Sequence, residues 1–159
     1  MKKSGLILVA LVLAVATVNA EGKMVPPESL PQKAKDFIAA NFAGKSVGYA
    51  EKEFNEYEVQ LNSAPAASEA VDSMTGATAA SNVEIKFNGK GEWKTIKSYG
   101  GVPAAVLPAS ITSYVTTNFA DAKIVEAEKE KNRIELKLST GIEVFFDKNG
   151  KFLGQKFDD

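Results

Sequence analysis

An internal repeat constrains the fold of this chain more than any other feature of its sequence. The run at 57–61 (YEVQL) recurs 77 residues later at 134–138 (IELKL). The run at 83–87 (VEIKF) recurs at 142–146 (IEVFF), but only 59 residues later. The two spacings differ by 18 residues, so the first copy contains an insertion that lies at about 63–81. Self-similarity of this kind indicates one structural unit that is present twice.

Each copy is predicted to contain one helix followed by about four strands. Leu30-Pro31 and Leu107-Pro108 each precede apolar residues at helical spacing, and a proline fits the first helical turn, where its missing N–H is not needed. These apolar residues are Ala34, Phe37, Ile38 and Phe42 in the first copy and Ile111, Tyr114, Val115 and Phe119 in the second. Beyond each helix, apolar and charged residues alternate with a period of two. That alternation predicts antiparallel strands with one buried face.

The expected fold class is therefore α+β, with two tandem units of one helix plus about four antiparallel strands. We place the first unit at residues 21–100, with its inserted loop at 63–81, and the second unit at residues 101–159. A unit of about 60 residues buries too little apolar surface to be very stable alone. The two units are therefore expected to share one sheet or to pack closely together.

The first 20 residues are predicted to be a secretion signal rather than part of the fold. Lys2 and Lys3 precede an apolar run from Leu6 to Val18, and small residues lead to a cleavage site after Ala20. The alternative is a membrane anchor, but the run is short for a transmembrane span. The mature protein is expected to be periplasmic or secreted, without stable membrane insertion after cleavage.

Composition removes several classes of function. The chain has no cysteine and no histidine, so neither a histidine-assisted nucleophile nor a histidine or cysteine metal site is possible. Without Lys2 and Lys3, 17 basic side chains face 20 acidic ones, and this balance does not favour nucleic acid as a partner. We expect a protein that is not an enzyme, with no catalytic residues and no metal ligands.

The repeated pattern resembles the PepSY-like family, also described as beta-lactamase-inhibitor-like. The resemblance lies in the Leu-Pro helix start, the Asn-Phe pair at 41–42 and 118–119, and strands that reach Asn88-Gly89 and Asn149-Gly150 before an aromatic residue. It covers about residues 27–159 apart from the insertion. The resemblance implies an exported bacterial protein of tandem helix-and-sheet units. Inhibitor relatives block an enzyme with exposed loops, but no motif in this chain carries that activity over.

The insertion contains a second resemblance. Asp72, Thr75, Gly76, Ala77 and Thr78 match the motif Asp-x-x-(Ser/Thr)-Gly-Ala-(Thr/Ser), on which a bacterial flavin transferase places FMN. The match implies that Thr78 accepts FMN through a phosphoester and that the other four residues are recognised by the transferase. The covalent FMN would then carry out redox chemistry. The alternative interpretation is a plain solvated loop.

Two functions follow as hypotheses. The first is an extracytoplasmic electron-transfer module that carries covalent FMN, with the flavin transferase and membrane or periplasmic redox proteins as partners. The second is a cofactor-free periplasmic module that binds or inhibits another protein with its sheet face or its loops.

Four other features are interpreted as structural. Trp93 is predicted to pack in the core rather than to stack on a flavin. Phe145 is expected on the charged face of its strand, and the charged run from Glu126 to Arg133 is expected to be a solvated turn. Asp147 begins a hairpin turn rather than a calcium loop, because the later acidic ligands of such a loop are missing.

Overall fold

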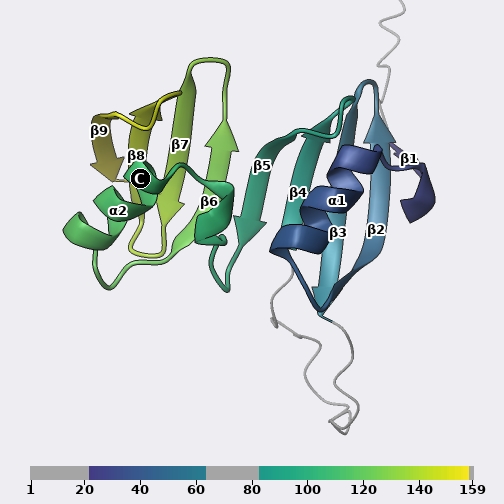
Figure 1. The fold of residues 1–159 in the computed structure, drawn as a ribbon, viewed down its shortest axis with the longest axis horizontal. Helices are drawn as coiled ribbons and strands as arrows, with labels where there is room; N and C mark the ends of the chain where they lie inside the picture. The colour runs from purple at the N-terminus through teal and green to yellow at the C-terminus, as the bar shows by residue number, and fades with distance from the viewer. Residues whose placement is uncertain (1–21, 64–82, 158–159) are drawn as a thin grey trace, which may run out of the picture.

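The computed structural model describes residues 22–63 and 83–157 (Figure 1). Two helices, α1 (Gln32–Asn41) and α2 (Ala109–Asn118), alternate with runs of strands, and short 3-10 turns at Pro27–Ser29 and Ala104–Val106 precede them. The strands in these residues are β1 (Lys23–Met24), β2 (Lys45–Glu53), β3 (Glu56–Ser63), β4 (Val83–Asn88), β5 (Trp93–Ser98), β6 (Ile124–Lys129), β7 (Arg133–Leu138), β8 (Ile142–Asp147) and β9 (Phe152–Phe157).

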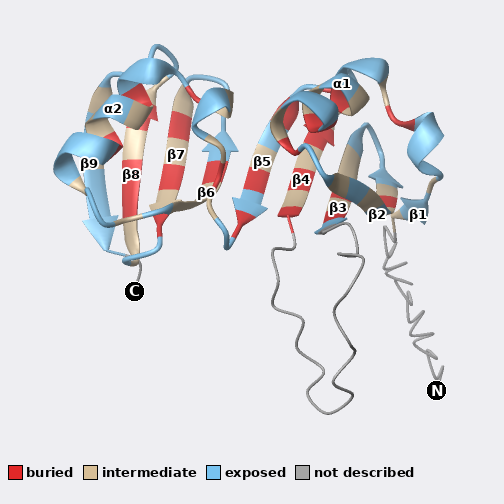
Figure 2. Ribbon diagram, turned by 60° about the horizontal axis from the view of Figure 1, so that its bottom comes forward, coloured by how far each residue is buried: buried red, intermediate tan, exposed pale blue. Residues whose placement is uncertain are grey.

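The nine described strands form one antiparallel sheet in chain order, from β1 to β9. We call α1 with β2–β5 the first half and α2 with β6–β9 the second half. The halves are joined by pairing of β5 with β6, in which Ile96 lies opposite Ala127. Both helices lie on the same face of the sheet (Figures 1 and 2). The prediction of an α+β fold with antiparallel strands is confirmed.

The helices begin directly after the two repeated prolines. Pro31 and Pro108 have extended backbones, and each carbonyl accepts a hydrogen bond from the first turn: from the Ala34 N–H at 2.9 Å and from the Ile111 N–H at 3.0 Å. The prolines therefore lie one position before the helices, where a missing N–H has no consequence. At the other end, the side-chain amide of Asn41 donates to the Phe37 carbonyl at 2.9 Å. Asn118 repeats this contact on α2.

The core lies between the helices and the face of the sheet that they cover. In the first half, the ring of Phe37 meets the buried ring of Phe87 edge to face, with centroids 5.8 Å apart. In the second half, Tyr114 meets Phe146 in the same way at 5.5 Å. Edge-to-face pairs are a favoured geometry for aromatic rings. The alternation seen in the sequence is confirmed here, because every second residue of β4 and β7 is buried.

The other face of the sheet is open and carries a row of alternating charges. Lys97 lies 3.5 Å from Glu84 and 3.9 Å from Glu126, and Lys156 lies 2.8 Å from Glu143. The row crosses six strands, with one residue each from β4 to β9: Glu84, Lys97, Glu126, Lys137, Glu143 and Lys156. Opposite charges directly across neighbouring strands are favourable. The alternation lets this face remain in contact with water without a large field of one sign.

Phe145 interrupts this charged face as the sequence predicts. Its half-buried ring lies opposite Glu135 and Gly154 in the register of the sheet. The guanidinium of Arg133 lies 5.2 Å from the ring centroid and the ammonium of Lys156 lies 5.9 Å from it. Cations at these distances are attracted to the ring.

The strands that flank the insertion, β3 and β4, pair with each other in the sheet. Val59 pairs with Ile85 across β3 and β4, and the corresponding Leu136 pairs with Val144 across β7 and β8. The two hairpins have the same register, yet the second closes through residues 139–141 alone. The strand pairing of the first hairpin therefore does not need the additional residues.

Candidate functional site

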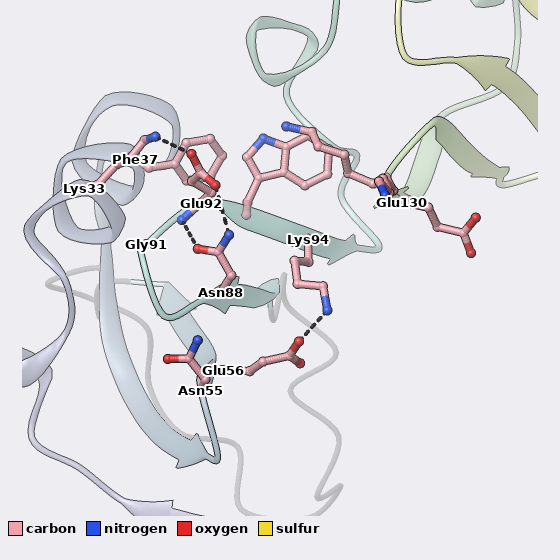
Figure 3. Close-up of a pocket in the computed structure, with 12 residues that line it drawn as sticks. Lys33, Phe37, Asn55, Glu56, Asn88, Gly91, Glu92, Lys94 and Glu130 are labelled. Atoms are coloured by element: carbon pink, nitrogen blue, oxygen red, sulfur yellow. Dashed lines mark hydrogen bonds and ion pairs between the residues drawn. The ribbon is translucent and has the colours of Figure 1, made fainter.

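A groove of about 750 Å³ lies where the two halves meet, at one end of the sheet (Figure 3). We call it the junction groove. Lys33 and Phe37 of α1 line it on one side, and residues 129–131 of the second half line it on the other. Between these two sides lie residues 55–56 of the β2–β3 hairpin and, from the β4–β5 hairpin, residues 88 and 91–94. Segments nearly a hundred residues apart in the chain therefore form one site.

The α1 side of the groove is held by a charged network on the β4–β5 turn. The Lys33 ammonium donates to one carboxylate oxygen of Glu92 at 2.8 Å, and the Asn88 side-chain amide donates to the other at 2.9 Å (Figure 3). Lys33 and then Asn88 lower the pKa of Glu92 to about 2. The carboxylate therefore stays charged at any physiological pH.

The turn beneath this network has the same form in both halves. The side-chain oxygen of Asn88 accepts hydrogen bonds from the N–H groups of Lys90 and Glu92. Asp147 accepts from Asn149 and Lys151 in the same way, and these backbone bonds lower the pKa of its carboxyl. This geometry is an Asx turn. It confirms the interpretation of Asp147 as a turn residue.

A second ion pair of the groove joins β5 to the start of β3. Lys94 pairs with Glu56 at the start of β3, and Figure 3 shows the two side chains meeting across the strands. Both side chains are about half exposed. Exposed pairs of this kind contribute little stability. Their effect here is to hold two long side chains at the border of the groove.

The floor of the groove is the indole of Trp93, the single tryptophan of the chain. Trp93 is only 7% exposed, which confirms the prediction that it packs. The Lys129 ammonium lies 4.1 Å from the centroid of its ring. Partial burial lowers the pKa of Lys129, while the Glu92 carboxylate acts in the opposite direction. A cation over an indole face is favourable, and more so where water is partly removed.

Within the described residues of the second half, the place that corresponds to the groove is built differently. Phe152 occupies the place of Trp93 after the turn, and its ring stacks on Tyr114 with centroids 4.6 Å apart and an interplanar angle of 16°. The space between helix and hairpin is thus filled by two rings. Ser110 stands where the first half has Lys33, and Lys151 stands where it has Glu92. The charged network is therefore specific to the first half.

An exposed aromatic residue extends the surface beyond the groove. Phe54 lies in the β2–β3 turn, next to Asn55, and is 83% exposed. Its φ of 49° is left-handed, and among the described residues it is the only non-glycine residue with a positive φ. A bulky residue in this conformation is strained. Because the Phe54 ring is exposed, it adds little to the packing of the core, and its backbone conformation is unfavourable. Stability of the fold therefore does not explain a phenylalanine at this position.

Asp72, Thr75, Gly76, Ala77 and Thr78, the residues of the predicted FMN motif, lie outside the described residues. The segment that contains them leaves the sheet after β3 and returns at β4. Because successive strands are antiparallel, this end of the sheet is opposite to the end that carries the β4–β5 turn and the groove (Figure 1). The strand ends that flank this segment, at Ser63 and Val83, therefore lie at the end of the sheet opposite to the groove.

Sequence reasoning did not find the groove. It interpreted the charged run from Glu126 to Arg133 as a solvated turn, but residues 126–129 belong to β6 and Arg133 begins β7, so only residues 130–132 form the turn. Lys129 and Lys131 border the groove. Lys33 on α1 was not distinguished from other surface lysines. Within residues 22–63 and 83–157, no group of three or more acidic side chains is placed to hold a metal ion. In the same residues, no helix is long and apolar enough to span a membrane.

The fold and the groove define a small α+β protein whose turns form an exposed surface at one end of an open sheet. The profile of the PepSY-like family, described as beta-lactamase-inhibitor-like, matches residues 16–76 and 67–154. The chain therefore belongs to this family, as the repeated pattern indicated. A search among curated proteins found no match.

Solved structures of similar fold come from Bacteroides. One, described as a calcium-regulated periplasmic protein of Bacteroides thetaiotaomicron, is 28% identical with a TM-score of 0.70, over 85% of this chain and 96% of that one. A periplasmic protein of Bacteroides vulgatus is 31% identical with a TM-score of 0.68, over 87% and 98%. Another from the same species, described as of unknown function, is 27% identical with a TM-score of 0.69, over 86% and 99%. All three of these similar proteins are described as periplasmic.

Proposed function

We propose that this protein is an exported, non-enzymatic binding module that holds a partner protein at the junction groove. The observation that carries the proposal is the groove itself, which is open and has walls from both halves. Its polar side chains are mostly committed to ion pairs and to the turn, as in the Lys33–Glu92 pair, and are therefore held in place. Fixed charges around an aromatic floor are features of recognition surfaces.

Phe54 supports a protein as the bound partner. The Phe54 ring is exposed to water beside a charged groove. A partner that covers the ring would remove this apolar surface from water, which is favourable. Aromatic residues are enriched in protein interfaces. Pockets for small molecules, in contrast, are mostly apolar and enclosed. The charged lining and the neighbouring Phe54 therefore favour a macromolecular partner.

Two further inferences complete this proposal. The halves are copies of one unit, because the hairpins β3–β4 and β7–β8 share one register and both helices begin after Leu-Pro. Residues 1–20 act as a cleaved secretion signal that delivers the protein to the periplasm or the exterior. The periplasmic descriptions of the similar structures support this location.

Photo-crosslinking tests the binding function. A photoreactive phenylalanine analogue at Lys131, on the groove border, should capture one partner in cells that export the protein. The partner, identified by mass spectrometry and purified, should bind the wild-type protein in solution. Reversal of the charge in Lys131→Glu should weaken that binding by about tenfold or more, since it replaces attraction with repulsion at the interface.

The matched control is Lys148, an exposed lysine in the β8–β9 turn of the second half. The photoreactive residue at position 148 should give no such product, and Lys148→Glu should bind the partner normally. The same product from both positions, or equal binding by the two charge-reversed variants, would refute the groove as the binding site.

A second candidate function is the presentation of covalent FMN on Thr78. The observation that favours it is the equal register of the two hairpins, since the extra residues between β3 and β4 are an addition that the sheet does not need. Added segments on a repeated scaffold commonly carry function. The protein would then be an extracytoplasmic electron carrier that exchanges electrons with membrane or periplasmic redox proteins.

The attachment needs a separate enzyme, because a threonine hydroxyl is a weak nucleophile without an activating base. With a flavin dinucleotide as donor, the Thr78 oxygen would attack the phosphorus of the FMN half. The hydroxyl would lose its proton, and AMP would leave as the pyrophosphate bond breaks. Asp72, Thr75, Gly76 and Ala77 would be the residues that the transferase recognises. The bound flavin would supply the redox chemistry, and the protein would present it.

Co-expression with a flavin transferase tests this candidate. The wild-type protein should show flavin fluorescence in a denaturing gel and a mass increase of one FMN group, and Thr78→Ala should lose both completely. Replacement of residues 62–82 by Ser-Thr-Gly, the turn of the second hairpin, should also remove the flavin. That variant should unfold within about ten degrees of the wild type, because shortening the loop changes the free energy of loop closure by only about 2 kcal/mol.

Ser81→Ala is the control, since it removes a hydroxyl outside the motif and should leave the modification complete. Fluorescence retained in Thr78→Ala would exclude Thr78 as the acceptor. Unmodified protein from cells that contain an active transferase would exclude the flavin function altogether.

A further inference from the structure

The charges of the junction groove are unequally compensated. On the side of the first half, Lys33 is paired with Glu92 at 2.8 Å and Lys94 is paired with Glu56. These four side chains add no net charge to the site. An incoming ligand would find their charges already neutralised, so they shape the groove more than they attract a partner.

The side of the second half carries positive charge that is not neutralised. Glu130 also lines the groove, but its carboxylate pairs at 3.2 Å with Arg133, which is not a lining residue. Among residues 22–63 and 83–157, no ion pair joins Lys129 or Lys131 to an acidic side chain. The contact that Lys129 does make is with the ring of Trp93. Glu92 attracts Lys129 without forming an ion pair with it. Within the described residues, two exposed lysines without an ion-pair partner therefore border the open groove.

The sheet order fixes the shape of the segment that could cover this surface. The β2–β3, β4–β5 and β6–β7 turns lie at the same end of the sheet, since successive strands are antiparallel. The first and last of these turns, which carry Phe54 and Lys131, are four strand spacings apart, or about 19 Å. An extended chain of about six residues spans that distance.

We propose that the junction groove binds an extended acidic segment of a partner protein, whose carboxylates pair with Lys129 and Lys131 and whose apolar side chain covers Phe54. The proposal rests on the binding function given above and adds the chemistry of the partner. Charge complementarity supports the acidic partner, because the two lining residues without an ion pair, Lys129 and Lys131, are both positive. An entering carboxylate draws the Lys129 ammonium from the indole, so binding changes the surroundings of Trp93.

The single tryptophan makes this binding directly measurable. The probe is a blocked eight-residue peptide of alternating glutamate and leucine, without tryptophan or tyrosine. Its addition should change the Trp93 fluorescence in a saturable way at low salt, and high salt should weaken the binding, since screening reduces attraction between exposed charges. The double variant Lys129→Gln and Lys131→Gln should bind the peptide at least about tenfold more weakly.

Three controls complete the experiment. The same peptide with glutamine in place of glutamate should not bind, Lys148→Gln should bind as the wild type does, and inorganic phosphate should not reproduce the fluorescence change. Circular dichroism should show that the double variant is folded. Equal binding of the two peptides, unchanged binding by the double variant, an equal response to phosphate, or no saturable change at millimolar peptide would overturn the proposal. A crosslinked partner that still depends on Lys131 would then leave the binding function standing.

Discussion

Replacement of Phe87 by alanine should lower the free energy of unfolding by about 3–5 kcal/mol. The Phe87 ring is fully buried between the sheet and α1, and it meets the Phe37 ring edge to face at 5.8 Å. Removal of the ring leaves a cavity below α1 that neighbouring strands cannot fill, because Val59 and Ile85 beside it are already packed with no exposed surface. A loss of this size is a large part of the 5–15 kcal/mol that stabilises a typical domain.

Urea unfolding followed by far-ultraviolet circular dichroism measures this loss. Phe145→Ala is the matched control, because it removes the same ring from the open face, where Phe145 is only half-buried. That variant should lose about 1 kcal/mol. If the two variants were equally stable, the Phe87 ring would not be the packing centre of the first half.

Gly91→Ala should destabilise the protein by about 2–4 kcal/mol. The glycine has a φ of +78°, a conformation that costs alanine about 1–2 kcal/mol. An added Cβ would also lie 2.8 Å from the backbone nitrogen of Ala34 and 2.9 Å from the Cβ of Pro31. The first turn of α1 would have to move away from the sheet, and Ala34 is fully buried there.

Gly141→Ala separates the two contributions. Gly141 has the same φ of +78°, but an added Cβ would meet nothing within 4 Å. This control should lose only the conformational part, about 1–2 kcal/mol. Thermal unfolding of both variants measures the difference. Equal melting temperatures would mean that α1 does not rest on the β4–β5 turn as closely as the contacts indicate.

Much of the fold could be predicted because its signals are local and occur twice. The alternation at Val83, Ile85 and Phe87 is a signal within six residues, and the repeat at Ile142 to Phe146 confirms which face is buried. The helices were placed by Leu-Pro and by apolar spacing in the same way. The two-residue strand β1 was not predicted, because Lys23-Met24 carries no pattern and pairs only with Glu51 and Lys52 of β2.

The groove could not be predicted, because its parts meet only in three dimensions. Lys33 and Lys131 are almost a hundred residues apart, and neither stands in a motif. Trp93 was correctly predicted to be packed, but the Lys129 ammonium over its ring was not predicted. The signal that was available was the difference between the copies: Trp93 for Phe152, and Glu92 for Lys151.

The chain-ordered sheet has a consequence for how the protein forms. Every described strand pairs only with the strands next to it in the sequence. A strand near the amino end therefore does not depend on a strand near the carboxyl end for its pairing. Pairing of strands that follow one another keeps the contact order lower than pairing of distant strands would, and a lower contact order favours faster folding. A polypeptide that becomes available from its amino end could add each new strand to the growing edge as it appears. This topology therefore suits vectorial assembly in a chain that has no cysteine to form disulfides.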